Sequence, residues 1–433
     1  MKKFLNLSKK NFAIYGLGST GLSVINYFKK INFNNYTIWD DSKKLKKKWN
    51  LDKLKKESFI KSLKYVDYIV LSPGINLNNA QFRKEILANK SKIISDLDLF
   101  YMFNSSMKSI VVTGTNGKST TCKIIHHVLK KNKINSILGG NIGKPILSLN
   151  FKENSYVIIE ASSFQLAYSK FVKPNFAIIL NISNDHLDWH KSMNNYINSK
   201  FKIFSLQNKK NYALINNQSL IKKYKRKKYL GKLIFINSKN YSKIKNQIKN
   251  SYLNSKANDE NMSFVFALSK LLKIKEKSLI QSLESFKGLS HRHEIFLKKN
   301  NKIFINDSKA TSFQASKFAL ESNKNIFWIV GGKPKIGDKF NLVKLKKNII
   351  KSYIIGKNLN KFKNLLGGKV NYELCRSLKN AIFLIFKDIK KFNHKDITVL
   401  LSPASASYDQ YENFEERGNE FKKLIKTYAG KYL

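Results

Sequence analysis

The chain has 433 residues, of which 42% are hydrophobic, and a formal net charge of +53 at pH 7. This length predicts two or three domains with well-buried cores. No apolar run approaches the roughly 20 residues that a membrane helix needs, and the basic start lacks the apolar region and cleavage site of a signal peptide. We therefore expect a cytoplasmic protein without a membrane partner. Cys122 and Cys375 lie far apart, which argues against a disulfide framework or a zinc site.

The excess of basic residues raises the possibility of a nucleic-acid-binding protein, because cationic surfaces attract polyphosphate. The lysines are, however, spread with asparagine and isoleucine through the whole sequence instead of gathering on one element. We interpret the charge as a compositional bias that gives a solvated basic surface, and we expect no specific nucleic-acid partner. Even the densest run, KKYKRKK at 222–228, is predicted to lie in a loop or small insertion.

Short apolar segments alternate with helical stretches along most of the chain, which is the pattern of parallel α/β units. Predicted helices include 22–31 and 118–131. The predicted strands are rich in Ile, Val and Tyr and cover residues 11–15, 36–41, 68–74, 109–114, 156–163, 176–183, 302–311, 326–333, 352–357 and 397–405. We predict three consecutive α/β domains, at residues 1–96, 97–288 and 289–433.

The first strand leads into a glycine loop. Gly16, Gly18 and Gly21 follow it directly and precede a helix, while Asp40 and Asp41 end the next strand. Glycines at this position let a ligand approach the backbone, the helix N-terminus favours a diphosphate, and the acid can accept from a hydroxyl or N–H group. A dinucleotide, a nucleotide-diphosphate sugar and a tight turn without a ligand all fit this pattern.

The segment VVTGTNGKST at 111–120 resembles a phosphate-binding loop, although Val112 stands where the usual loop has its first glycine. Because a strand meets a helix here, backbone N–H groups and Lys118 can hold phosphates while a hydroxyl reaches Mg²⁺. The residues expected to form this loop are Gly114, Thr115, Asn116, Gly117, Lys118, Ser119 and Thr120.

Further polar residues follow the next two predicted strands. Glu160 ends one strand, and Asp185 and His186 come just after the other. Parallel strands bring their carboxyl ends to the same edge of a sheet, where ligands of α/β folds bind. These groups can hold Mg²⁺ ions that neutralise charge during phosphoryl transfer. We expect no such role for the other histidines nearby, His126, His127 and His190.

Lys200 presents a conflict of charge. If its helix faces the metal edge, an ammonium group would repel Mg²⁺, and the arrangement becomes favourable only when the lysine is carbamylated and turned into an anion. Spacing alone favours the simpler interpretation that Lys200 is one of many solvated lysines.

Many short motifs, in order along nearly the whole chain, resemble the Mur ligase family. They are GLGSTG, SPGI, GTNGKST, GGNIGKP, EASSFQL, LNISNDHLDWH, SKFKIF, GLSHRHE, NDSKATS, GGK and SPASASYDQYENFEERGNEF. In this family the shortened phosphate loop is the normal form, so the resemblance implies an ATP site.

The resemblance implies a Rossmann-like N-terminal domain that binds a UDP-linked substrate, a central P-loop-type ATPase domain with a mainly parallel sheet, and a Rossmann-like C-terminal domain that binds an amino acid. The implied activity is the ATP-dependent addition of D-glutamate to UDP-N-acetylmuramoyl-L-alanine, through an acyl phosphate, in peptidoglycan synthesis. The small-molecule partners are these two substrates and ATP, and we expect a monomer.

The resemblance also assigns residues. ATP would be held by the loop 114–120 and by Asn258, Asn261, Arg292 and Asp307. Two Mg²⁺ ions would be organised by Ser119, Glu160, His186 and carbamylated Lys200. The UDP substrate would contact Ser19, Thr20, Asp40, Gly74, Asn141 and His186. D-glutamate would contact Lys309, Thr311, Lys335, Ser407 and Phe414. Catalysis would depend on Lys118, His186 and Lys200.

Three positions depart from the family pattern. Ser312 stands where asparagine is frequent, His293 replaces an aromatic residue, and Tyr408 replaces a leucine. These departures concern details of the amino-acid pocket more than the class of reaction.

Other interpretations remain open. A sister ligase that adds L-alanine or a diamino acid shares the ATP machinery, although the former usually has histidine in place of Asn116. A folate-type polyglutamate ligase would not need the first glycine loop. An NAD-dependent enzyme would leave the second loop unexplained, and nucleic-acid binding would explain only the charge.

Overall fold

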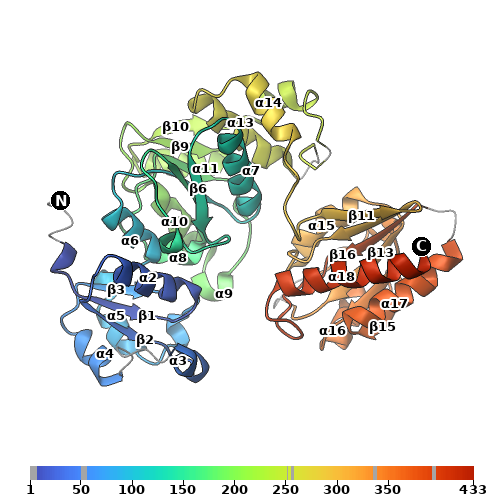
Figure 1. Ribbon diagram of the computed structural model, residues 1–433, viewed down its shortest axis with the longest axis horizontal. Helices are drawn as coiled ribbons and strands as arrows, with labels where there is room; N and C mark the ends of the chain where they lie inside the picture. Colours follow the sequence, from blue (N-terminus) through green and yellow to red (C-terminus); the bar gives the residue numbers. More distant parts are fainter. Residues whose placement is uncertain (1–6, 50–55, 251, 255–257, 335–338, 393–395) are drawn as a thin grey trace. The chain divides into compact units, whose positions relative to one another are not determined.

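A computed structural model describes residues 7–49, 56–250, 252–254, 258–334, 339–392 and 396–433 (Figure 1). The chain forms two compact units, Met1–Phe286 and Lys287–Leu433. Three sheets with helices on their faces confirm the predicted α/β class: two lie in the first unit and one in the second. The division between the units falls beside the predicted boundary at 288. None of the helices in the described ranges combines the length and apolar character that crossing a membrane requires.

The first sheet is fully parallel, with the strand order β2-β1-β3-β4. Its strands are β1 (Phe12–Tyr15), β2 (Tyr36–Trp39), β3 (Tyr68–Leu71) and β4 (Ile93–Ile94). Its helices are α2 (Ser19–Lys30), α3 (Lys43–Trp49), α4 (Lys56–Ser62) and α5 (Arg83–Ala88). Every residue of β1 is buried because helices cover both faces of the sheet, and this explains why the strand is apolar throughout.

The second sheet is also parallel, in the order β10-β9-β8-β5-β7-β6. Its strands are β5 (Lys108–Thr113), β6 (Ser136–Gly140), β7 (Tyr156–Glu160), β8 (Phe176–Ile179), β9 (Tyr212–Ile215) and β10 (Lys232–Phe235). The helices of this part are α6 (Asp96–Phe103), α7 (Lys118–Lys131), α8 (Ser163–Tyr168), α9 (Leu187–His190), α10 (Met193–Phe201), α11 (Gln218–Arg226), α12 (Ser238–Lys245), α13 (Asp259–Leu271) and α14 (Glu276–Glu284). The central position of β5 places the residues that follow it in the middle of the sheet edge.

The prediction that 222–228 forms a loop is wrong for most of this run, since α11 extends to Arg226. Leu220, Ile221 and Tyr224 are buried on one side of the helix, and the Tyr224 hydroxyl donates to the Gly231 carbonyl at 2.7 Å. Apolar residues separated by three or four positions form one buried side of the helix. Of the lysines between them, Lys222 is exposed, and Lys223 is half-buried and donates to Asn194 Oδ1 at 3.2 Å.

Buried acids on α6 hold α8 and the residues that follow it. Asp96 accepts from Gln165 Nε2 at 3.0 and 3.2 Å, and Asp98 Oδ1 accepts from the backbone N–H groups of Lys170 and Phe171. Gln165 also forms a capping box with Ser162 at the start of α8. These contacts fix α8, whose first residues lie beside the candidate site.

The third sheet, in unit 2, has the order β11-β12-β16-β13-β14-β15, and only the β11–β12 pair is antiparallel. Its strands are β11 (Glu294–Lys299), β12 (Lys302–Asn306), β13 (Ile326–Gly331), β14 (Ile349–Ile355), β15 (Tyr372–Arg376) and β16 (Ile397–Leu401). Its helices are α15 (Phe313–Ser322), α16 (Leu359–Leu366), α17 (Leu378–Ile389) and α18 (Phe414–Tyr432). Buried residues of β13 and β16 occupy the centre of this unit.

Candidate active site

The predicted phosphate loop connects the carboxyl end of β5 to the N-terminus of α7. Gly117 has φ +81°, and a Cβ atom there would lie 2.1 Å from Asn261 Oδ1. The position therefore requires glycine, both for its left-handed conformation and for the close approach of α13. Asn261 in turn donates to Asn258 Oδ1 at 3.1 Å, so the structure brings these two predicted ATP residues to the loop.

Asn181, which follows β8, holds the loop from the other side. Its carbonyl accepts from Thr115 N at 2.9 Å, and its Oδ1 accepts from Asn116 N at 2.8 Å. The Nδ2 group of Asn181 donates to Glu260 on α13. No local motif in the sequence indicates Asn181 or Glu260, because their contacts depend on the neighbouring strand and helix.

The N-terminus of α7 has the properties of an anion site. Gly117 provides no side-chain cap, and the backbone N–H groups and dipole of a helix N-terminus favour an anion. Ser119 and Thr120 lie in the first turn and are buried. The Lys118 ammonium lies over the loop, 2.9 Å from the Gly114 carbonyl and 2.7 Å from the Thr115 carbonyl. This geometry suits a polyphosphate, with the lysine as a point charge beside it.

Glu160, at the end of β7, is buried. Its Oε1 accepts from Asn141 Nδ2 at 2.8 Å, while its buried Oε2 has no hydrogen-bond partner among the residues that the structure describes. A buried carboxylate oxygen without a partner is costly. The second oxygen is therefore suited to a cation that the chain itself does not supply.

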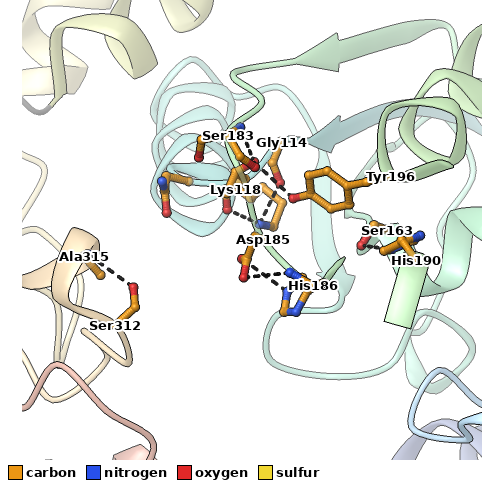
Figure 2. A network of polar contacts seen from close by, with 12 residues as sticks. Gly114, Lys118, Ser163, Ser183, Asp185, His186, His190, Tyr196, Ser312 and Ala315 are labelled. Atoms are coloured by element: carbon orange, nitrogen blue, oxygen red, sulfur yellow. Dashed lines mark hydrogen bonds and ion pairs between the residues drawn. The ribbon is translucent and has the colours of Figure 1, made fainter. Parts of the chain in front are cut away.

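Asp185 and His186 lie near Lys118 (Figure 2). His186 Nε2 is 3.3 Å from Asp185 Oδ2, and the His186 N–H donates to Asp185 Oδ1 at 3.0 Å. His186 has φ +54°, a left-handed conformation that is uncommon for histidine. The strained backbone and the carboxylate together fix the direction of the imidazole.

Lys200 is buried at the end of α10, with 1% of its surface exposed. Its Nζ donates to the Gly114 carbonyl at 2.9 Å and lies 4.5 Å from the centre of the Tyr196 ring. Burial lowers the pKa of this lysine well below its usual value, the charge of Lys118 lowers it further, and Asp185 opposes the change. Lys200 is therefore not one of the solvated lysines, and its neutral amine is favoured.

Two aromatic residues near the site have no assignment from the sequence. The Tyr196 hydroxyl is 3.0 Å from Thr115 Oγ1, so it links α10 to the phosphate loop (Figure 2). His190 Nε2 is 3.0 Å from Ser163 Oγ, and its ring stacks on Phe164. Burial lowers the pKa of His190 to about 4, which keeps the imidazole neutral in this contact.

The glycine loop of the first sheet lies between β1 and α2. A Cβ atom on Gly21 would lie 1.7 Å from the Gly16 carbonyl oxygen, so this close approach requires glycine. Asp40 is buried, and its carboxylate accepts from the N–H groups of Leu17 at 2.5 Å and Ser42 at 2.7 Å. Three further predicted substrate residues lie at the same sheet edge: Ser19 and Thr20 open α2, and Gly74 follows β3. Asn141 and His186 instead follow β6 and β8 of the second sheet.

In unit 2, Asp307 follows β12 and is buried, with 8% of its surface exposed. Its Oδ1 accepts from His293 N at 3.1 Å and its Oδ2 accepts from Ser402 Oγ at 2.7 Å. Burial raises the pKa of Asp307 to about 7, although the charge of Arg292 opposes the increase. The structure thus brings Arg292 and Asp307 close together, as their shared assignment requires.

Residues predicted to contact the amino acid follow the carboxyl ends of β12 and β16 in the same sheet. Lys309 Nζ is 3.6 Å from the centre of the Phe414 ring, and Ser407 is buried in the loop after β16. Thr311 lies in the segment between β12 and α15. Lys335 is outside the described residues. Three residues depart from the family pattern. Ser312 caps α15, His293 contacts Phe318, and Tyr408 is 71% exposed.

The donor set fits Mg²⁺ bound together with phosphates. Within the described ranges no three His, Cys, Asp or Glu side chains gather as a ready metal site. Glu160, at the end of β7, supplies one carboxylate oxygen without a partner among the described residues, and Ser119, in the first turn of α7 after the neighbouring strand β5, supplies a hydroxyl. Mg²⁺ is usually held by one or two carboxylates, water and substrate phosphates, so these residues fit the predicted ion.

Comparison with known proteins identifies the family of the chain. The model of the MurD-like N-terminal domain of Mur ligases matches residues 10–95, and that of the Mur ligase middle domain matches residues 112–281. The UDP-N-acetylmuramoylalanine--D-glutamate ligase of Wolbachia sp. subsp. Brugia malayi is 34% identical and covers 97% of both chains. The enzyme of the same name from Rickettsia bellii is 33% identical and covers 97% of this chain and 98% of its own.

The fold is similar to that of the MurF ligase of Thermotoga maritima in complex with ADP, with a TM-score of 0.57, 16% identity, and coverage of 98% of this chain and 99% of that chain. Because two domain models match in order and relatives above 30% identity span nearly the whole length, the chain belongs to the Mur ligase family of ATP-dependent ligases.

Proposed function

We propose that this protein joins D-glutamate to UDP-N-acetylmuramoyl-L-alanine, with ATP converted to ADP and phosphate, in the synthesis of peptidoglycan precursors. The observation that carries the proposal is the phosphate loop after β5, with Lys118 over it and the unpartnered Glu160 oxygen at the end of the neighbouring strand. The names of the full-length relatives favour D-glutamate over the other amino acids that this family adds.

The proposed division of labour follows the three sheets. Residues 1–96 bind the UDP moiety through Ser19, Thr20, Asp40 and Gly74, and Asn141 and His186 direct the acyl end of this substrate. Residues 97–288 bind ATP, with Asn258 and Asn261 beside the loop. Residues 289–433 contribute Arg292 and Asp307 to the nucleotide and hold the amino acid. We further propose that the protein acts as a cytoplasmic monomer.

The reaction proceeds in two transfers. A carboxylate oxygen of the muramoyl-L-alanine substrate attacks the γ-phosphorus, the bond from that phosphorus to the bridging oxygen breaks, and ADP leaves. The amine of D-glutamate then attacks the acyl carbon and loses a proton to solvent, and the bond to phosphate breaks. Lys118 and the N–H groups of α7 stabilise negative charge on the transferred group, so the protein contributes positioning and electrostatics.

Two Mg²⁺ ions would be held by Ser119, Glu160, His186 and carbamylated Lys200, and when bound they would neutralise phosphate charge. The neutral amine of Lys200 can attack carbon dioxide and lose a proton, which forms an anionic carbamate. Burial supports this step, because it favours the uncharged amine over the ammonium ion.

The D-glutamate pocket would need cationic and polar groups for the two carboxylates of the substrate. Lys309 with its aromatic neighbour Phe414, together with Thr311 and Ser407, supplies this character, and Lys335 is proposed as a further member. Binding of ATP and amino acid to different domains requires closure before chemistry, which protects the acyl phosphate from water.

The proposal is tested by phosphate release with Mg²⁺, ATP and UDP-N-acetylmuramoyl-L-alanine, to which D-glutamate, L-glutamate, L-alanine or a diamino acid is added singly. We expect rapid release only with D-glutamate, together with an equal amount of ligated product. Release that is fastest with another amino acid would contradict the assigned substrate, and absence of release with all of them would contradict the ligase activity.

The carbamate is tested by Lys200→Ala. We expect a loss of at least a hundredfold in kcat, with partial recovery when a small carboxylate such as formate is added. Lys209→Ala, at an exposed lysine outside the site, is the matched control and should retain the parent rate. An unchanged kcat in Lys200→Ala, or a loss that no carboxylate restores at all, would contradict the proposed role.

A further inference from the structure

Unit 1 contains a cavity of about 640 Å³ at the edge of its sheets that the candidate active site does not use. Tyr68, which lines it, is the first residue of β3, and the lining residues Asn175 and Asn211 immediately precede β8 and β9. The phosphate loop instead follows the carboxyl end of β5. Since the strands are parallel, one strand length of roughly 13 to 20 Å separates the two edges.

The inner wall of the cavity is apolar and held in place by packing. Tyr68 stacks on Phe12, with 5.4 Å between the ring centres, and meets the edge of Phe171 at 5.9 Å. Met102 is buried at the end of α6 and lines the same cavity. A volume of this size with an apolar, preformed wall is typical of a small-molecule site.

Three lysines from three separate segments line the same cavity, and no acidic residue is among its described lining residues. Lys10 precedes β1 and pairs with Asp67 at 2.7 Å. Lys173 and Lys210, in the loops before β8 and β9, form no ion pair with any described residue. The cavity therefore has a positive charge that the protein leaves uncompensated.

The neutral polar groups of the cavity also include free donors. Asn175 Oδ1 accepts from Ser109 N at 2.8 Å, and Asn211 Oδ1 accepts from Asn208 N at 2.9 Å. Within the described residues, the Nδ2 groups of both asparagines and the Tyr68 hydroxyl make no hydrogen bond. Ammonium, amide and hydroxyl donors thus surround one apolar space, and a ligand that complements them has several acceptor oxygens and an apolar body.

We propose that this cavity binds an organic phosphate, with the phosphoryl oxygens at Lys173, Lys210 and the two asparagine amides and the apolar body against Tyr68, Met102 and Phe171. The site is separate from the phosphate loop of the same unit, and the proposal does not depend on the proposed function. Exposed lysines alone would attract any anion weakly, whereas this site also recognises the body of the ligand.

The test measures binding of 1-naphthyl phosphate to the full chain by calorimetry, with a non-hydrolysable ATP analogue at saturation throughout. Three comparison compounds separate the contributions to binding. Inorganic phosphate has the phosphoryl group alone, 1-naphthalenemethanol has the apolar ring without an anionic group, and 1-naphthoate has the ring with a carboxylate in place of the phosphate. We expect each of the three to bind at least tenfold more weakly than 1-naphthyl phosphate.

The double variant Lys173→Ala/Lys210→Ala should raise the Kd for 1-naphthyl phosphate at least tenfold. The matched control is Lys209→Ala/Lys239→Ala, which removes two exposed lysines outside the cavity and should change the Kd by less than threefold. Equal Kd values for the two double variants, equal or tighter binding of any comparison compound, or no binding of 1-naphthyl phosphate at millimolar concentration would overturn the proposal.

Discussion

The buried Asp307 carboxyl should make the stability of unit 2 depend on pH. Its pKa is raised by burial from an ordinary value of 3.8 to about 7, so the folded state binds the proton more tightly than the unfolded state. The resulting stabilisation is complete below pH 4 and is lost as the pH rises to about 7. The loss is ~1.4 kcal/mol for each pH unit, which gives ~3 kcal/mol between pH 5 and the folded-state pKa of about 7.

Asp307→Asn should remove this dependence without disturbing the local contacts. The amide oxygen can accept from His293 N, and the amide nitrogen can donate to Ser402 Oγ, which replaces the two present hydrogen bonds. Relative to the parent, the variant should therefore gain ~3 kcal/mol of unfolding free energy when the pH rises from 5 to 8.5.

The assay is native-state hydrogen exchange of peptides from β12 and β16, corrected at each pH for the intrinsic exchange rate, because it resolves the opening of unit 2 within the full chain. At each pH, the unfolding free energy of the parent is subtracted from that of the variant, which removes the contribution of the other titrating groups. The control is Asp396→Asn, at an exposed carboxylate of the same unit. Its unfolding free energy should differ from that of the parent by the same amount at every pH. If the unfolding free energies of Asp307→Asn and the parent differ by the same amount at every pH, the claim that burial raises the pKa of Asp307 is refuted.

Three kinetic predictions concern contacts of the candidate site. Gly117→Ala places a Cβ atom 2.1 Å from Asn261 Oδ1, so the KM for ATP should rise at least tenfold in initial-rate assays; an unchanged value would contradict the loop geometry. Tyr196→Phe removes a hydrogen bond worth about 1 kcal/mol and should lower kcat about fivefold, whereas equal rates would exclude a positioning role. Phe414→Ala removes the ring beneath Lys309 and should raise the KM for D-glutamate several-fold, and an equal rise in the KM for ATP would argue against a pocket contact.

The sequence predicts the main strands well because they are buried on both faces and their apolar runs are continuous. Of the hairpin β11–β12, only β12 was among the predicted strands; β11 was not, although Asn300 and Asn301, both with positive φ, mark the two-residue turn between them. This asparagine pair is a recognisable turn signal. By contrast, most of the run 222–228 belongs to a helix that the sequence did not predict. The buried side of this helix consists of only three residues, and the lysines around them obscure the apolar pattern.

The site is predictable only where its residues belong to a local motif. The phosphate loop, Glu160 and His186 follow predicted strands, so their common edge can be inferred from the sequence. The burial of Lys200 depends on how α10 packs below the loop, and the spacing of a lysine among many lysines contains no signal for it. The contacts of Asn181 and Tyr196 depend in the same way on tertiary packing.

The 81 basic and 28 acidic residues are distributed differently between the surface and the interior. Three basic residues are buried in the described chain, and none forms an ion pair there: Lys200, Lys302 and Arg417. The buried acids accept from N–H, amide or hydroxyl groups instead of lysines: Asp40, Asp96, Asp98, Glu160 and Asp307. The lysine excess is therefore a property of the surface. There it can raise the association rate of anionic substrates, an effect that weakens with added salt. The interior contacts that define the sites do not depend on it, which is why net charge is a poor guide to the reaction.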